Sequence, residues 1–278
     1  MTSTIGRFQG RRACLAVLVA LVATACATGQ VAPSPSPASP SVAPVTAAPS
    51  ASPTPSPPVT PTPPPATPPP NALPIGDLTA GATYSLAVGC DASRCWYVTE
   101  NGQELLVTVP ARGWLAIDTW FLGKDNMDPE GYDMTLLPYT IGNVYADPCQ
   151  WRGIGHRIIA VGPTVDDLAN ALVAQEGPGA KPAAAVTVGG YPGKRVELTI
   201  PDDVDTKTCD EGDFGRWSPI NDPSHYGPFT YGNGQHDTVY IVDVGGTRWV
   251  IDTNYLPGTS PANIAELKAL VASIRFDS

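Results

Sequence analysis

A long proline-rich tract sets the limit on what this chain can fold into. Residues 31–72 consist almost entirely of Pro, Ser, Thr, Ala and Val, with no charged or aromatic side chain. Such a segment has too little apolar surface to form a core, and its prolines favour an extended polyproline II backbone. We therefore predict a disordered, semi-rigid tether there, and we expect folded structure only after it.

The segment before the tether has the parts of a bacterial export signal. Three arginines precede an apolar run at 13–22, which is shorter than the roughly 20 residues that a membrane-spanning helix needs. The small residues before Cys26 resemble the lipobox of bacterial lipoproteins, although Ala23 stands where that family most often has Leu. The resemblance implies cleavage before Cys26 and attachment of lipid, including acyl chains such as palmitate, to that cysteine.

These features predict three parts of the chain. We expect a signal peptide at 1–25, a lipidated cysteine with a disordered linker at 26–72, and a single extracytoplasmic α+β domain at 73–278. The predicted location is the outer face of the cell membrane, with the membrane as a partner through the lipid anchor. The formal net charge is −10, and an acidic surface repels phosphate backbones, so nucleic acid is not an expected partner.

Four cysteines follow the linker, and an even number in an exported chain indicates disulfides. Four cysteines allow three pairings. Cys90 and Cys95 are close enough in "CDASRC" to bridge a tight loop between two strands, which leaves Cys149 to pair with Cys209. The alternative, a zinc site, needs paired C-x2-C spacings that the sequence lacks.

The rest of the chain predicts an antiparallel sheet with two main helices. Turn formers separate β-branched and aromatic runs such as "ELLVTVP", "WLAIDTWF", "TVYIVDV" and "TRWVIDTNY". Thr164 and Asp167 have capping-box spacing before one helix, and Ser260 with Pro261 begins another. We expect Gly245-Gly246 to form a hairpin turn, and residues 201–235 to form a long irregular loop pinned by Cys209.

Candidate binding residues gather in that long loop. Trp217, Tyr226, Phe229 and Tyr231 are aromatic and could stack on sugar rings or on a partner if they are exposed, whereas a loop packed by its own side chains is the alternative. No catalytic motif, cofactor motif or metal-binding motif is present, and the acidic clusters lack the spacing of a calcium loop. We therefore predict no catalytic residues, no metal site and no cofactor.

The domain also resembles a known architecture. The segments "LTAGATYS", "VTVPARGW", "DPCQW", "TVDDLANAL", "VTVGGYPGKRVELTIP" and "LKALVASIRF" are similar to extracytoplasmic domains of bacterial lipoproteins, particularly those of actinobacteria. The order of strands and helices resembles the PsbP-like α/β/α sandwich, whose shared motifs here are structural. The resemblance implies no catalytic residue.

The function that we expect is non-enzymatic binding of a ligand or partner, such as a cell-wall or envelope component, outside the membrane. The alternative is an extracellular hydrolase or metal-dependent enzyme that uses acidic residues or His225 and His236. Only three histidines occur in the chain, and none stands in an H-E-x-x-H motif.

Overall fold

The computed structural model describes residues 68–87, 89–90, 95–96, 102–124, 133–139, 141–153, 157–177, 179–219 and 232–277. All of them belong to one compact unit, Pro61–Ser278. The predicted signal peptide, Cys26 and the linker up to residue 67 lie outside the described residues. Within the described part of the chain, no helix is long and apolar enough to cross a membrane.

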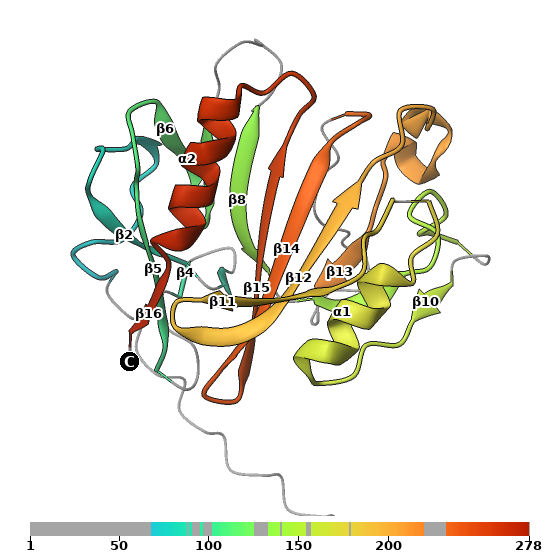
Figure 1. The fold of residues 1–278 in the computed structure, drawn as a ribbon, viewed down its shortest axis with the longest axis horizontal. Coiled ribbons are helices and arrows are strands. Elements are labelled where there is room, and N and C mark those ends of the chain that lie inside the picture. The colour runs from blue at the N-terminus through green and yellow to red at the C-terminus, as the bar shows by residue number, and fades with distance from the viewer. Residues whose placement is uncertain are drawn as a thin grey trace, which may run out of the picture. The chain divides into compact units, whose positions relative to one another are not determined.

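The largest element is an eight-stranded sheet with the order β1-β6-β7-β8-β15-β14-β12-β11, in which every neighbouring pair is antiparallel (Figure 1). Its strands are β1 (Gly76–Asp77), β6 (Trp114–Asp118), β7 (Phe121–Lys124), β8 (Met134–Tyr139), β11 (Ala184–Val188), β12 (Tyr191–Thr199), β14 (His236–Val244) and β15 (Thr247–Tyr255).

Three smaller sheets accompany it, with the orders β16-β5-β2, β10-β9-β13 and β3-β4. Their strands are β2 (Thr83–Leu86), β3 (Gly89–Cys90), β4 (Cys95–Trp96), β5 (Glu104–Thr108), β9 (Ile141–Tyr145), β10 (Ile158–Ile159), β13 (Trp217–Pro219) and β16 (Arg275–Asp277). The two α-helices are α1 (Val165–Val173) and α2 (Pro261–Ala272), and two short 3-10 turns are η1 (Thr206–Thr208) and η2 (Asp210–Gly212).

The two helices pack on opposite faces of the large sheet. Buried residues of α2 join a cluster with Val242 and Ile251, whereas buried residues of α1 join one with Ile241 and Val250. Adjacent residues of a strand point to opposite faces, so each helix covers its own face. The predicted α+β class, an antiparallel sheet with two main helices, is confirmed, while the PsbP-like assignment stays a prediction.

Local signals form the predicted helices and the last hairpin. Thr164 and Asp167 make both hydrogen bonds of the capping box, and the Ser260 hydroxyl accepts from the Asn263 amide. Gly245 and Gly246 have φ angles of 58° and 86°, the left-handed values that a tight hairpin turn between β14 and β15 requires.

Two sequence expectations differ from the structure. The run "WLAIDTWF" is not one strand, because the chain turns after β6 and the Asp118 carboxylate accepts a hydrogen bond from the Thr119 amide before β7 begins. The run "MTLLPYTIGNVYAD" predicts one more strand before Cys149, but it divides between β8 and β9, which belong to different sheets. Sequence periodicity predicts extended backbone in both runs, but it does not report the change of direction.

The Cys149–Cys209 disulfide is present and joins residues 60 positions apart. It packs with Ile200, Val204 and Phe214 in a small separate core, where it fixes the start of the long loop as predicted. In β3 and β4 the backbone register places Cys90 directly opposite Cys95. The side chains of that pair lie outside the described residues, so their bridge stays a prediction.

Candidate functional site

The strands β12, β14 and β15 form the floor of a groove of about 280 Å³ beside α2. The sheet register places polar residues of these strands side by side: Glu197 is paired with Thr238, and Thr199 with His236. These residues alternate with Val196, Leu198 and Val239, which are buried against α1 on the other face. Strand alternation therefore gives this part of the sheet one buried face and one polar, accessible face.

Aromatic rings line part of the groove. The rings of His236 and Tyr255 stack with centroids 4.9 Å apart, and the Nδ1 of His236 lies 3.2 Å from the Thr199 hydroxyl. Tyr240 also lines the groove, and burial raises the pKa of its hydroxyl, which stays protonated at neutral pH. Within the described part of the chain, the hydroxyls of Tyr240 and Tyr255 have no hydrogen-bond partner, so both can bond to a ligand.

Charged side chains also line the groove, and Arg195 is paired with Tyr240 across the strands. The Glu197 carboxylate accepts a hydrogen bond from the Nζ of Lys181 at 2.6 Å and pairs with the Nη2 of Arg195 at 2.9 Å. The hydrogen bond from Lys181 is the largest cause that lowers the pKa of Glu197, and the charges of Arg195 and Lys268 lower it further. Lys268, on α2, forms no ion pair with any described carboxylate.

A narrower cleft of about 30 Å³ continues from the groove beneath α2. Ile264, Leu267 and Val271 of the helix line it, and it shares Thr238, Tyr240, Tyr255 and Lys268 with the groove. A volume of this size is close to that of one water molecule. The main space for a ligand is therefore the polar groove.

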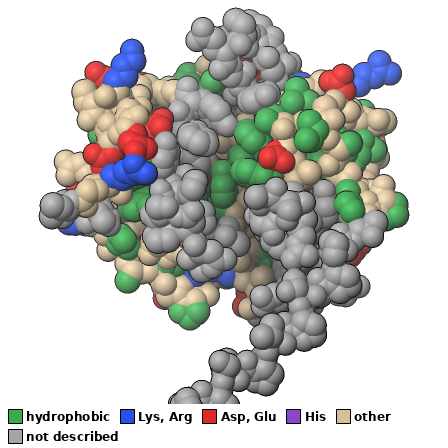
Figure 2. All heavy atoms as spheres, turned by 180° about the vertical axis from the view of Figure 1, so that it is seen from behind, with side chains coloured by type: hydrophobic (Ala, Val, Ile, Leu, Met, Phe, Trp, Pro, Cys, Tyr) green, Lys and Arg blue, Asp and Glu red, His purple; other side chains and the backbone are tan. Residues whose placement is uncertain are grey.

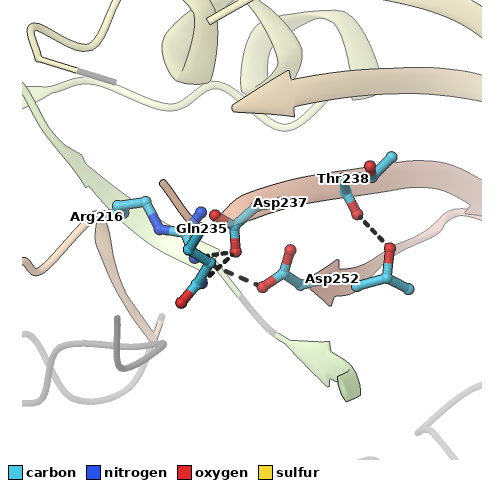
Figure 3. A network of polar contacts seen from close by, with 6 residues as sticks. Arg216, Gln235, Asp237, Thr238 and Asp252 are labelled. Carbon is cyan, nitrogen blue, oxygen red and sulfur yellow. Dashed lines mark hydrogen bonds and ion pairs between the residues drawn. The ribbon is translucent and has the colours of Figure 1, made fainter. Parts of the chain in front are cut away.

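A second polar cluster lies on the opposite face of the sheet and is closed to solvent (Figure 3). The Oδ1 of Asp237 accepts from the Nη2 of Arg216 at 2.9 Å and from the Nε2 of Gln235 at 2.8 Å. Asp252 places its Oδ2 3.7 Å from the same Arg216 nitrogen, and the guanidinium lies 4.6 Å from the centre of the Trp217 ring.

The charges of this cluster balance. Burial lowers the pKa of Arg216, but the nearby Asp237 and Asp252 carboxylates outweigh it and raise that pKa. Burial and the charge of Asp237 raise the pKa of Asp252 to about 8, against the opposing effect of Arg216. The raised pKa favours the protonated form of Asp252 near neutral pH, and Arg216 with Asp237 forms the buried ion pair of the cluster. Because Arg216 directly precedes β13, the cluster links the small sheet of β13 to β14 and β15.

The structure corrects one predicted binding residue. Trp217 begins β13, is 1% exposed, and makes an edge contact with Tyr139, so it is a core residue and not an exposed ligand contact. Its prediction as a binding residue in an open loop is therefore wrong, because β13 pairs with β9 and carries Trp217 into the core under α1. Tyr226, Phe229 and Tyr231 lie outside the described residues, and so does His225.

The described acidic residues of the long loop serve local structure. Asp205 caps η1, Asp210 accepts from the Arg152 amide, and Glu211 pairs with the Arg152 guanidinium. Figure 2 shows the face opposite to that of Figure 1, where acidic and basic side chains lie beside one another. Among the described residues, no three His, Cys, Asp or Glu side chains converge to hold a metal ion.

The sequence analysis does not predict the groove, although the sequence contains a pattern that indicates its polar strand faces. In "KRVELT" and "HDTVYIVDV" polar and aromatic residues alternate with aliphatic ones, which indicates a strand with one solvated face. Only the fold shows that two such polar faces are adjacent and that Lys268 of α2 stands beside them. The Arg216, Asp237 and Asp252 cluster has no local sequence signal.

Comparison with solved structures finds similar chains, of which one is described here. No family model matches the chain, and no curated protein matches it. The crystal structure of LpqN, which is involved in cell envelope biogenesis of Mycobacterium tuberculosis, is 10% identical, covers 71% of this chain and 86% of its own, and has a TM-score of 0.32. That TM-score does not establish a common fold, and neither site nor function is inferred from it.

Proposed function

We propose that this protein is a lipid-anchored binding protein that holds a small ligand outside the cell in the groove of β12, β14, β15 and α2, without performing chemistry on it. The groove carries the proposal: it is about 280 Å³ in volume, and it is lined by hydroxyls and an ammonium that have no polar partner within the described part of the chain. Ligand sites are concave surfaces of this kind with a few convergent polar groups.

The location rests on the sequence and is supported by the disulfide. The signal-like segment, Cys26 and the proline-rich tract have the order of an anchored, tethered domain. The Cys149–Cys209 bridge fits an oxidising compartment, because thiols in the bacterial cytosol are kept reduced. The intact mass of the protein extracted from membranes tests this part. We expect a chain that begins at Cys26 and carries lipid; an unmodified Cys26 would contradict the anchor.

The buried carboxylates do not favour a catalytic role. Asp237 and Asp252 both lie beside Arg216, and neither side chain is exposed to a substrate. His236 lies in the groove, but its described polar contact is the Thr199 hydroxyl. The hydroxyls, rings and ammonium that line the groove therefore suit binding of a ligand better than its hydrolysis.

Filling the groove tests the binding function. Thr238 lines both the groove and the cleft, so Thr238→Trp places an indole in the ligand space. Thr187→Trp is the matched control, because Thr187 is exposed on edge strand β11. A library of small polar compounds is screened by saturation-transfer NMR on the full-length protein in non-ionic detergent. Compounds that bind wild type and Thr187→Trp should fail to bind Thr238→Trp; equal binding to both variants would refute the groove as the site.

A further inference from the structure

The charge of the groove is opposite in sign to that of the chain. The whole sequence has 26 acidic and 16 basic residues, yet Lys181, Arg195 and Lys268 line the groove against Glu197. Asp237 also borders it, but its carboxylate is fully buried and neutralised by Arg216 on the other face. Among the described residues that line the groove, one accessible carboxylate therefore faces three cations, and their net charge is positive.

The single carboxylate is already shared. Glu197 bonds to Lys181 through Oε2 and to Arg195 through Oε1, so both of its oxygens are occupied. Lys268 is left without a partner among the described carboxylates, although it is near enough to lower the pKa of Glu197. A positive concave surface on an acidic protein concentrates anions, and an unpaired ammonium gives them a direct contact.

Hydroxyl groups and ring faces surround this charge. Thr199, Thr238, Tyr240 and Tyr255 line the groove with hydroxyls, and the stacked His236 and Tyr255 rings provide flat apolar surface. A polyhydroxylated ring uses both features, since its hydroxyls pair with side-chain hydroxyls while its C–H face lies on an aromatic ring. A purely apolar ligand would leave these polar groups unpaired.

Resting on the groove as the binding site, we propose that its ligand is an acidic sugar, a pyranose-sized ring that carries a carboxylate or a phosphate. The anionic group lies against Lys268, next to Arg195 and Lys181. The ring lies over β14 and β15, against Tyr240 and the His236–Tyr255 pair. Carboxylate and phosphate make the same charge-assisted hydrogen bonds with ammonium and guanidinium groups, so the probes compare the two.

The test uses the full-length protein in non-ionic detergent with four probes: glucose, glucuronate, glucose 6-phosphate and inorganic phosphate. Titration calorimetry gives the dissociation constants for wild type, for the lysine variants Lys268→Gln and Lys194→Gln, and for the groove-filling variant Thr238→Trp. Lys194 is the matched control, since it is on the same strand as Arg195 but pairs with Asp166 of α1 on the opposite face. Both lysine variants remove one positive charge from the domain.

We expect at least one acidic sugar to bind several-fold more tightly than glucose. Lys268→Gln should weaken that binding by about 5-fold, the effect of losing roughly 1 kcal/mol of a partly exposed charge contact. Lys194→Gln should bind as wild type does. Raising NaCl from about 50 to about 500 mM should weaken binding of the acidic sugar, because salt screens an exposed charge pair.

Each other outcome overturns the inference in a distinguishable way. If glucose binds as well as glucuronate, and Thr238→Trp abolishes both, the groove binds ligands but the anion preference is wrong. If inorganic phosphate binds as tightly as glucose 6-phosphate, the ring is not recognised and the sugar assignment is wrong. Equal losses in Lys268→Gln and Lys194→Gln would show attraction by overall charge only. If Thr238→Trp abolishes the binding of none of the probes, this inference is wrong. The library screen then tests separately whether the groove is a binding site.

Discussion

The Nη2 of Arg216 lies 2.9 Å from the Oδ1 of Asp237, and neither side chain has any exposed surface. Moving such charges out of water costs several kcal/mol, which their attraction offsets only while both partners are present. Two further donors of Arg216, Nε and Nη1, have no acceptor within the described part of the chain. Loss of either partner of this pair should therefore lower the free energy of unfolding strongly.

Replacing the cation should destabilise the domain strongly. Arg216→Met leaves Asp237 buried without its partner, and we expect a loss of about 3 to 5 kcal/mol in the free energy of unfolding. Urea denaturation followed by tryptophan fluorescence measures it. Arg195→Met is the control, because its partially exposed pair with Glu197 should contribute no more than about 1 kcal/mol. Similar losses in the two variants would contradict the structural role of the buried pair.

The buried acid Asp252 should make stability depend on pH. Its pKa is about 8 in the folded protein against an ordinary 3.8, so between these values the native state binds more protons than the unfolded state. The free energy of unfolding therefore falls as pH rises through this window, by at most about 1.4 kcal/mol per pH unit from this group. The contribution is complete below about pH 4 and lost above about pH 8.

Asp252→Asn removes this titration while keeping a neutral side chain of the same shape. Denaturation of wild type and variant at intervals from pH 5 to 9 should show the variant gaining stability relative to wild type as pH rises. Asp243→Asn, at an exposed position near the end of β14, serves as the control for an acid outside the cluster. A difference between wild type and Asp252→Asn that is constant over pH would mean that Asp252 is ionised throughout.

The sequence predicts local features of this fold better than its long-range ones. The capping box at Thr164, the hairpin at Gly245 and the helix start at Ser260 each depend on neighbours within a few residues, and each is observed. Trp217 is different, because its burial depends on the pairing of β13 with β9 and on α1, which no short segment encodes. The groove likewise arises when β12, β14 and α2 meet.

Gly193 illustrates the same limit. The run "GGYPG" predicts a hairpin turn that ends at Gly193, but in the structure Gly193 is inside β12, opposite Val242. A Cβ there would stand 2.1 Å from the carbonyl oxygen of Ile241, so Gly193→Ala must push β12 away from β14. We expect a cost above about 2 kcal/mol, against about 1 kcal/mol for Gly190→Ala, whose added Cβ meets open space in the turn. Comparable urea midpoints for the two variants would contradict this close approach.

The disulfide should account for a large share of the stability. It closes a loop of 60 residues, and the chain-entropy account assigns about 4 kcal/mol to such a crosslink. The double variant Cys149→Ala/Cys209→Ala should therefore unfold at a markedly lower urea concentration than wild type. We also expect protease cleavage to appear first between residues 201 and 215, since the bridge fixes this segment. An unchanged midpoint with unchanged proteolysis would show that the local core holds the loop without the bridge.

Glu197 should oppose the ligand that its neighbours attract. Because it pairs with Lys181 and Arg195, Glu197→Gln frees both cations and removes the only accessible carboxylate among the described residues that line the groove. We expect binding of the acidic sugar identified above to strengthen by about 3- to 10-fold, which corresponds to roughly 1 kcal/mol, while stability changes by less than about 1 kcal/mol. Calorimetric titration measures the gain in affinity, and this gain should be smaller at high salt because screening weakens the freed charges.

Glu176→Gln is the control, since Glu176 forms an exposed pair with Arg157 away from the groove. Weaker binding in Glu197→Gln would mean that this carboxylate contacts the ligand itself, as expected for a sugar hydroxyl held by an acceptor and not for an anion held by cations.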